Sequence, residues 1–138
     1  MRVDIKNSNR LAETIKIVTG ESLNNPIYGI TTDSRSCRPG DLYIALTGIR
    51  SDGHQYLNEV QRKNASAALV SKLSTDKNSK IQQILVDDTK IALGLIANRW
   101  RKNFNIPVIA ITGSNGKTST KELLNHVLND KYNVHATQ

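Results

Sequence analysis

The 138-residue sequence has few of the residues that build disulfides, base-stacking surfaces or membrane spans. Its single cysteine, Cys37, cannot form an internal disulfide, and nothing else indicates an oxidising compartment. Aromatic residues make up only 4% of the chain, which argues against a nucleic-acid partner bound by base stacking. No apolar run approaches the roughly 20 residues of a membrane span, and the N-terminus lacks the apolar core of a secretory signal. We therefore expect a cytoplasmic protein with no membrane partner.

The remaining composition is typical of an ordinary folded protein. Hydrophobic residues at 38% and charged residues at 22% exclude intrinsic disorder, collagen-like repeats and a coiled coil. At roughly 100–200 residues per domain, the length predicts one domain or two small ones. Residues 89–138 contain seven Lys or Arg against two acidic residues, whereas residues 1–88 contain 12 against 10. Such a basic field suits a phosphate-bearing partner, although a solvated basic face is the plainer interpretation.

Hydrophobic periodicity predicts alternating helices and strands. In the first part of the chain the predicted helices cover 8–20, 54–63 and 89–104, and the predicted strands cover 27–31, 42–46, 67–70 and 84–86. A continuous apolar run at 107–111 predicts a further strand before a helix over 117–129, and residues 132–136 are expected to form the next strand. The buried stripe of that helix is predicted to consist of Leu123, Leu124, Val127 and Leu128. This alternation predicts an α/β fold with parallel pairing.

The predicted elements suggest two domains of unequal completeness. We expect a first domain over residues 1–88, a connecting helix over 89–105 and the start of a second domain over 106–138. One βαβ unit cannot cover both faces of a parallel sheet, so either the chain is a fragment or residues 106–138 pack against something else. The fragment hypothesis predicts an exposed apolar edge around 108–111 and Val134, and poor independent folding of this part.

The most specific chemical signal lies between a predicted strand and a predicted helix. It consists of Gly113, Ser114, Asn115, Gly116, Lys117, Thr118 and Ser119. The glycines allow backbone N–H groups to turn toward a phosphate, and the helix N-terminus adds about half a positive charge at the same point. Lys117 is then the candidate catalytic residue that reaches the terminal phosphates, and Thr118 is the candidate Mg²⁺ ligand. Two residues rather than four separate the glycines, so a tight turn with an incidental lysine is the alternative.

This shortened loop resembles the ATP loop of the Mur ligases, which add amino acids or dipeptides to the UDP-linked muramic acid precursor of the bacterial cell wall. Three further segments are similar, in order and spacing, to the UDP-binding N-terminal domain of that family. They are Thr32-Asp33-Ser34-Arg35, Pro39 to Leu46, and Gly48 with Asp52-Gly53-His54. The resemblance covers nearly all of residues 27–138. It implies a small α/β UDP-binding domain followed by the first βαβ unit of a P-loop ATPase domain.

The resemblance also implies an activity. Mur ligases use ATP and Mg²⁺ to convert a carboxylate of UDP-N-acetylmuramoyl-peptide into an acyl phosphate, which an amine then attacks. Asn115 and Lys121-Glu122 look most like the branch that adds D-alanyl-D-alanine to the tripeptide, and the branch that adds the third amino acid is the alternative. The family's downstream metal-binding residues are absent from this sequence. We therefore expect the chain to be inactive alone, and the full-length enzyme to be a monomer.

Five residues of the first half are candidate contacts for the UDP end of the substrate: Ser34, Arg35, Thr47, Asp52 and His54. Ser34 offers a hydroxyl, and Arg35 can donate two hydrogen bonds to phosphate oxygens or pair with a carboxylate. A local turn with an internal ion pair is the alternative for Asp33 and Arg35. Loop and cap chemistry is the alternative for Thr47, Asp52 and His54. We interpret Cys37, His126 and His135 as structural or surface residues.

Two other classes of function remain open. One is a non-catalytic module that binds a nucleotide or a UDP-sugar. The other is an unrelated P-loop hydrolase or kinase, which requires an acidic Mg²⁺ ligand at the end of a later strand. The sequence offers no such strand.

Overall fold

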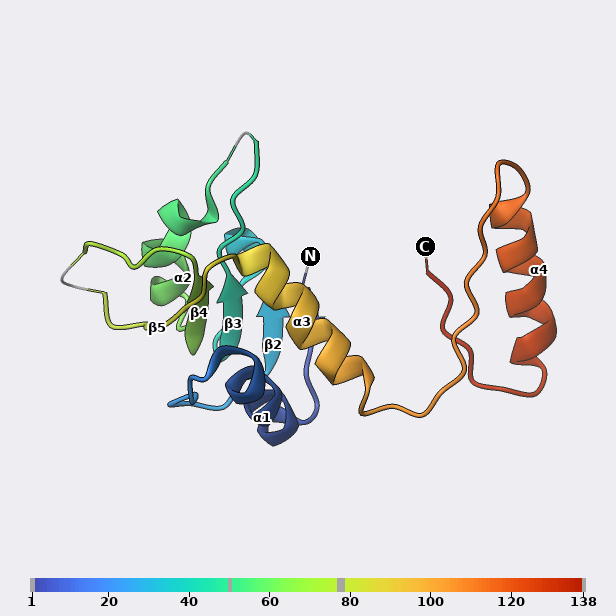
Figure 1. Ribbon diagram of the computed structural model, residues 1–138, viewed down its shortest axis with the longest axis horizontal. Helices are drawn as coiled ribbons and strands as arrows, with labels where there is room; N and C mark the ends of the chain where they lie inside the picture. Colours follow the sequence, from blue (N-terminus) through green and yellow to red (C-terminus); the bar gives the residue numbers. More distant parts are fainter. Residues whose placement is uncertain (1, 50, 77–78, 138) are drawn as a thin grey trace. The chain divides into compact units, whose positions relative to one another are not determined.

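A computed structural model describes residues 2–49, 51–76 and 79–137 of the chain (Figure 1). It contains two compact units, Met1–Phe104 and Asn105–Gln138. None of the helices in the described ranges combines the length and the apolarity needed to cross a membrane.

The first unit is built on a mixed five-stranded sheet with strands in sequence order. These are β1 (Arg2–Asp4), β2 (Gly29–Thr31), β3 (Asp41–Ile44), β4 (Ala67–Val70) and β5 (Gln82–Leu85). Strands β2 to β5 pair in parallel, whereas β1 runs antiparallel to β2. The α/β fold class and the four strands predicted in this half are confirmed. Strand β1 was not predicted, because three residues with one apolar side chain carry no periodic signal.

Helices and short 3₁₀ turns lie between several of the strands and after β5. They are α1 (Ser8–Thr19), the short 3₁₀ turns η1 (Ser34–Ser36) and η2 (Gly53–Tyr56), α2 (Leu57–Arg62) and α3 (Thr89–Arg101). Asn7 caps α1 by accepting a hydrogen bond from the Arg10 N–H, and the left-handed Gly20 ends it. Ser8, the first residue of α1, accepts a hydrogen bond from the Ile27 N–H at 2.8 Å. The segment predicted as one helix over residues 54–63 forms two elements, the 3₁₀ turn η2 followed by α2.

Alternation along β3 explains how the sheet buries both faces. Leu42 and Ile44 contribute to one core with residues of α1 and α3, whereas Tyr43 and Ala45 contribute to a second core with residues of α2. Figure 1 shows α1 (blue) and α3 (gold) side by side. Helix α3 is therefore an integral part of the first unit.

Within the described residues 105–137, the second unit has one regular element, α4 (Lys117–Asn129). This helix has the predicted bounds. The strands predicted over 107–111 and 132–136 do not form, because a strand requires a neighbouring strand to take its hydrogen bonds and neither segment has one among the described residues.

The apolar residues of the second unit are largely exposed. The predicted buried stripe of α4 is wrong for this structure, since Leu123 is 66% exposed, Val127 is 57% exposed, and Leu124 and Leu128 are only partly buried. None of the described residues of this unit is fully buried. The expected apolar edge is exposed at Val108 and Ile109, whereas Ile111 and Val134 are partly buried.

Candidate functional site

The glycine loop (residues 113–119) enters α4 through two left-handed backbone positions. Gly113 has φ 148° and Gly116, the N-cap residue of α4, has φ 74°. A Cβ at Gly116 would meet no atom within 4 Å, so the backbone conformation, and not crowding, favours glycine there. No side chain in the described residues caps the N-terminus of α4. The first N–H groups of the helix therefore remain without a side-chain acceptor.

Two lysines and two threonines border a hollow of about 250 Å³ beside this loop. Its lining consists of Ile109, Ile111, Lys117, Thr118, Lys121 and Thr137. The ammonium of Lys117 bends back and donates to the Gly113 carbonyl, and that of Lys121 donates to the Thr137 carbonyl at 2.7 Å. Two cations, free N–H groups and a hydroxyl at one helix N-terminus form a setting for a polyanion such as a phosphate chain.

Metal binding at this hollow depends on Thr118. In the described ranges no group of three or more His, Cys, Asp or Glu residues could hold a metal ion. Mg²⁺ is commonly held by few protein oxygens together with substrate phosphates and water. The Thr118 hydroxyl therefore fits a metal that arrives with a nucleotide better than one held by the protein alone.

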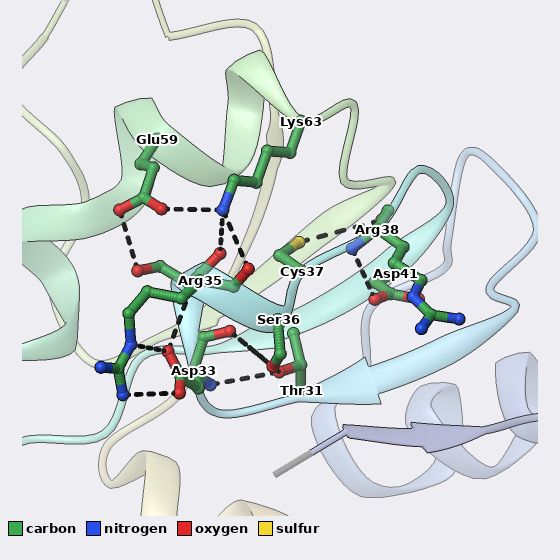
Figure 2. Close-up of polar contacts among 10 residues, drawn as sticks. Thr31, Asp33, Arg35, Ser36, Cys37, Arg38, Asp41, Glu59 and Lys63 are labelled. Atoms are coloured by element: carbon green, nitrogen blue, oxygen red, sulfur yellow. Dashed lines mark hydrogen bonds and ion pairs between the residues drawn. The ribbon is translucent and has the colours of Figure 1, made fainter.

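The Asp33 turn (residues 33–36) lies between β2 and β3 and is held by its own polar groups (Figure 2). The Asp33 carboxylate accepts from the Arg35 N–H at 3.0 Å and binds both Nε and Nη2 of the Arg35 guanidinium at 2.9 Å. These contacts lower the pKa of Asp33 from 3.8 to about 2. The internal ion pair is therefore formed, yet the Arg35 side chain remains 85% exposed.

Ser34 has a different environment from Arg35. Its side chain is buried, and its hydroxyl donates to Glu59 Oε2 at 2.9 Å. Lys63 donates to Glu59 Oε1 at 2.9 Å and to the carbonyls of Ser34 and Arg35 at 2.8 and 3.2 Å. Hydrogen bonds from Lys63 and then Ser34 lower the pKa of Glu59. The sequence analysis missed both Glu59 and Lys63. Their spacing of four residues in a predicted helix indicated a pair, but not its contact with a turn 25 or more residues away.

The remaining three candidates form a second network. Thr47 and Asp52 make an isolated antiparallel bridge, and the Asp52 carboxylate accepts from the His54 N–H at 3.0 Å. Asp52 also binds His54 Nδ1 and the Lys72 ammonium, each at 2.6 Å. His54 Nε2 accepts from the Ser71 N–H at 3.0 Å, so the ring proton is assigned to Nδ1. Lys72 first, and then the backbone and ring of His54, hold the pKa of Asp52 well below its usual range. The structure therefore contains the loop and cap chemistry expected as the alternative.

A buried ion pair that the sequence analysis missed supports this side of the sheet. Arg2 donates from Nε and Nη2 to the two carboxylate oxygens of Asp41 at 2.7 and 2.8 Å. Asp41 is fully buried and also accepts from the Arg38 N–H at 2.9 Å. A Cβ at Gly29 would lie 2.4 Å from Asp41 Oδ1, so this strand position must be glycine for the pair to fit. The ion pair therefore joins β1 and β3 across the intervening strand β2, which is the strand that pairs with both through backbone hydrogen bonds.

Of the residues interpreted as structural or surface residues, Cys37 directly follows the Asp33 turn, and its N–H donates to the Ser34 carbonyl at 3.3 Å. Cys37 is buried, and desolvation raises the pKa of its thiol to about 11. His126 and His135 are exposed in the second unit.

Two family models match consecutive parts of the chain. The model of the Mur ligase family, catalytic domain, matches residues 26–101, and that of the Mur ligase middle domain matches residues 111–138. The first match alone covers more than half of the chain. The chain belongs to the Mur ligase family.

Individual Mur ligases give the same assignment. Over 121 residues the chain is 41% identical to UDP-N-acetylmuramoyl-tripeptide–D-alanyl-D-alanine ligase of Synechocystis sp., covering 88% of the chain and 27% of the relative. Over 127 residues it is 36% identical to UDP-N-acetylmuramoyl-L-alanyl-D-glutamate–2,6-diaminopimelate ligase of Syntrophomonas wolfei, covering 88% and 26%. The chain thus spans about a quarter of the length of these Mur ligases.

Solved Mur ligase structures show the same fold. MurF from Acinetobacter baumannii matches with a TM-score of 0.77 at 33% identity, covering 87% of this chain and 27% of that one. The MurF ligase from Thermotoga maritima in complex with ADP matches with a TM-score of 0.66 at 32% identity, covering 74% and 23%.

Proposed function

We propose that this chain is the UDP-substrate-binding part and the nucleotide-binding loop of an ATP-dependent amide ligase. In this proposal the enzyme adds D-alanyl-D-alanine to UDP-N-acetylmuramoyl-tripeptide. The observation that carries it is the glycine loop, which opens onto the uncapped N-terminus of α4 with Lys117 and Thr118 beside one hollow. Support for the substrates comes from the names of the relatives, among which the D-alanyl-D-alanine ligases are frequent.

The glycine loop has the parts needed to hold the phosphates of ATP. In this proposal the backbone N–H groups of residues 113–118 donate hydrogen bonds to the phosphate oxygens, and Lys117 leaves the Gly113 carbonyl to neutralise charge on the terminal phosphates. Thr118 contributes its hydroxyl to Mg²⁺. ATP supplies the phosphoryl group that activates a substrate carboxylate for attack by an amine. Support for a nucleotide ligand also comes from the T. maritima relative, which was solved in complex with ADP.

The proposed contacts with UDP are not equivalent. Arg35 is the candidate for direct contact, because its guanidinium is exposed and can exchange the Asp33 carboxylate for a phosphate. The hydroxyl of Ser34 and both ring nitrogens of His54 already have protein partners. Thr47, Asp52 and His54 therefore act in this proposal by holding the loop that borders the substrate.

One assay of the full-length enzyme tests the proposed reaction. Phosphate release from ATP is measured with UDP-N-acetylmuramoyl-tripeptide plus D-alanyl-D-alanine, and separately with the dipeptide precursor plus a free diamino acid. Release with the first pair alone supports the proposal.

A second candidate function is the addition of the third amino acid. The 36% identity to the 2,6-diaminopimelate ligase of S. wolfei favours it. Release with the second substrate pair alone transfers the assignment to this reaction, and release with neither pair contradicts both.

A further inference from the structure

We propose that Glu59 and Lys63 are positioning residues for anion recognition by Arg35, and that they act through the backbone of the Asp33 turn without touching the ligand. This inference rests on the proposed function, in which Arg35 contacts the UDP-bearing substrate. Figure 2 shows the side chains of Glu59 in α2 and of Lys63, the C-cap residue of α2, reaching toward the turn.

The ammonium of Lys63 has three hydrogens and three acceptors around it. Two of these acceptors are the main-chain carbonyls of Ser34 and Arg35, and the third is Glu59 Oε1. Contacts with carbonyls constrain the path of the backbone whatever side chains the turn carries. Lys63 therefore holds the main chain of Arg35 in place.

The carboxylate of Glu59 completes the connection between α2 and the turn. Its Oε1 accepts from Lys63 and its Oε2 accepts from the buried hydroxyl of Ser34, so each oxygen holds a different group. The two residues thus hold the turn on its α2 side. Removing the charge of either one weakens the contacts of the other.

The guanidinium of Arg35 is left as the accessible group of the turn. In Figure 2 it points away from α2 and toward Asp33, and its side chain is 85% exposed. Lys63 holds the main-chain carbonyl of Arg35, whereas Asp33 holds the Arg35 N–H and the tip of its side chain. When a phosphate replaces the Asp33 carboxylate as the partner of the Arg35 guanidinium, the backbone of Arg35 is already ordered. Less conformational entropy is then lost on binding.

A double-mutant cycle on the 138-residue chain tests this role. UDP-N-acetylmuramoyl-tripeptide is titrated calorimetrically into the wild type, Lys63→Met, Arg35→Ala and the double variant. We expect Lys63→Met to weaken binding roughly tenfold, and to change it less than twofold when Arg35 is already alanine. Lys63→Arg restores most of the affinity, because a guanidinium can still donate to both carbonyls. Lys16→Met removes a lysine from the exposed face of α1 and leaves the affinity unchanged.

The outcomes separate this inference from the proposed function. Equal affinity of the wild type and Lys63→Met, with weakened binding in Arg35→Ala, overturns the positioning role alone. Additive losses in the double variant overturn it as well, because the two residues then act independently. Unchanged affinity in Arg35→Ala refutes the proposed substrate contact and the inference with it. If Lys63→Met does not fold, Glu59→Gln replaces it in the same cycle, since an amide keeps one oxygen but loses the charge that Lys63 contacts.

Discussion

Arg2 and Asp41 form a two-pronged ion pair between β1 and β3, with donor–acceptor distances of 2.7 and 2.8 Å. The two residues are 39 positions apart, and the Asp41 side chain is fully buried. This pair raises the pKa of Arg2 above its usual value, chiefly through the hydrogen bond to Asp41. It explains why the segment after Pro39-Gly40 begins with an aspartate at the start of a buried strand.

Removing Arg2 leaves the carboxylate of Asp41 buried without its cation. We expect Arg2→Met to lower the free energy of unfolding of the first unit by about 2–4 kcal/mol, as is typical of a broken buried pair. Urea unfolding followed by circular dichroism measures this loss. Asp4→Asn is the matched control, because Asp4 also pairs with Arg2 but is 79% exposed, and it should change stability by less than about 0.5 kcal/mol. Equal losses of stability in the two variants would contradict the conclusion that the buried contact of Arg2 with Asp41 stabilises the fold.

Gly29 and Gly94 should respond to alanine in opposite directions. At Gly29 a Cβ would lie 2.4 Å from Asp41 and 2.5 Å from Arg2, so Gly29→Ala should destabilise the fold by about 1–3 kcal/mol. At Gly94, inside α3, a Cβ meets nothing within 4 Å, so Gly94→Ala should stabilise it by about 0.5–1 kcal/mol. Thermal unfolding of both variants measures the difference. If both variants changed the unfolding temperature in the same direction, crowding at Gly29 would not explain the effect of Gly29→Ala.

The Asp33–Arg35 pair should depend on pH only under acidic conditions. Because the pKa of Asp33 is lowered from 3.8 to about 2, the stabilisation from this pair is fully present above pH 4 and is lost as the pH falls toward 2. The carboxyl carbon of Asp33, followed by NMR in a pH titration, reports the midpoint directly. In Arg35→Ala the midpoint should rise toward the ordinary value for aspartate. A midpoint that is ordinary in both proteins would mean that the pair is not formed in solution.

Lys117 should be required for ATP turnover in the full-length enzyme. Lys117→Ala removes the cation placed beside the glycine loop, and we expect kcat to fall by about 10²–10³-fold. Lys131→Ala is the control, since Lys131 lies over the Tyr132 ring and outside the lining of the hollow. Phosphate release measures both variants. Equal activity of Lys117→Ala and the wild type would remove the main support for a phosphate site here.

Cys37 should be unreactive in the folded chain. Burial raises the pKa of its thiol to about 11, so little thiolate forms at pH 8. An aromatic disulfide reagent should therefore modify Cys37 slowly in buffer and rapidly in urea. Rapid modification of the folded chain would show that the region around Cys37 opens readily.

The sequence predicted those elements whose signals are local. Helices α3 and α4 start at the predicted residues, Thr89 and Lys117, because a capping aspartate and a glycine mark these positions. Strand β4 has its predicted bounds because four apolar residues stand between polar ones. The strand expected over 107–111 failed because its formation depends on a partner strand, which periodicity within one segment does not provide.

The candidate sites also contain some features that local sequence predicts and others that only the fold brings about. The residue types and spacing of the glycine loop predicted a turn before a helix in which glycines free the backbone, and Gly113 and Gly116 have positive φ angles. The contacts of Glu59 and Lys63 with the Asp33 turn could not be predicted, because they join residues that the fold alone brings together. The exposed state of Leu123 and Val127 could not be predicted either, since their spacing indicates a buried face without saying what covers it.

Strand β1 also determines how one side of the sheet meets other molecules. It is the terminal strand, it is only three residues long, and it has a charged residue at each end. Short charged margins of this kind are poor templates for a strand from another chain. At the β1 edge of the sheet, a strand from another chain therefore has little backbone to pair with. Such intermolecular strand addition is the first step toward aggregation.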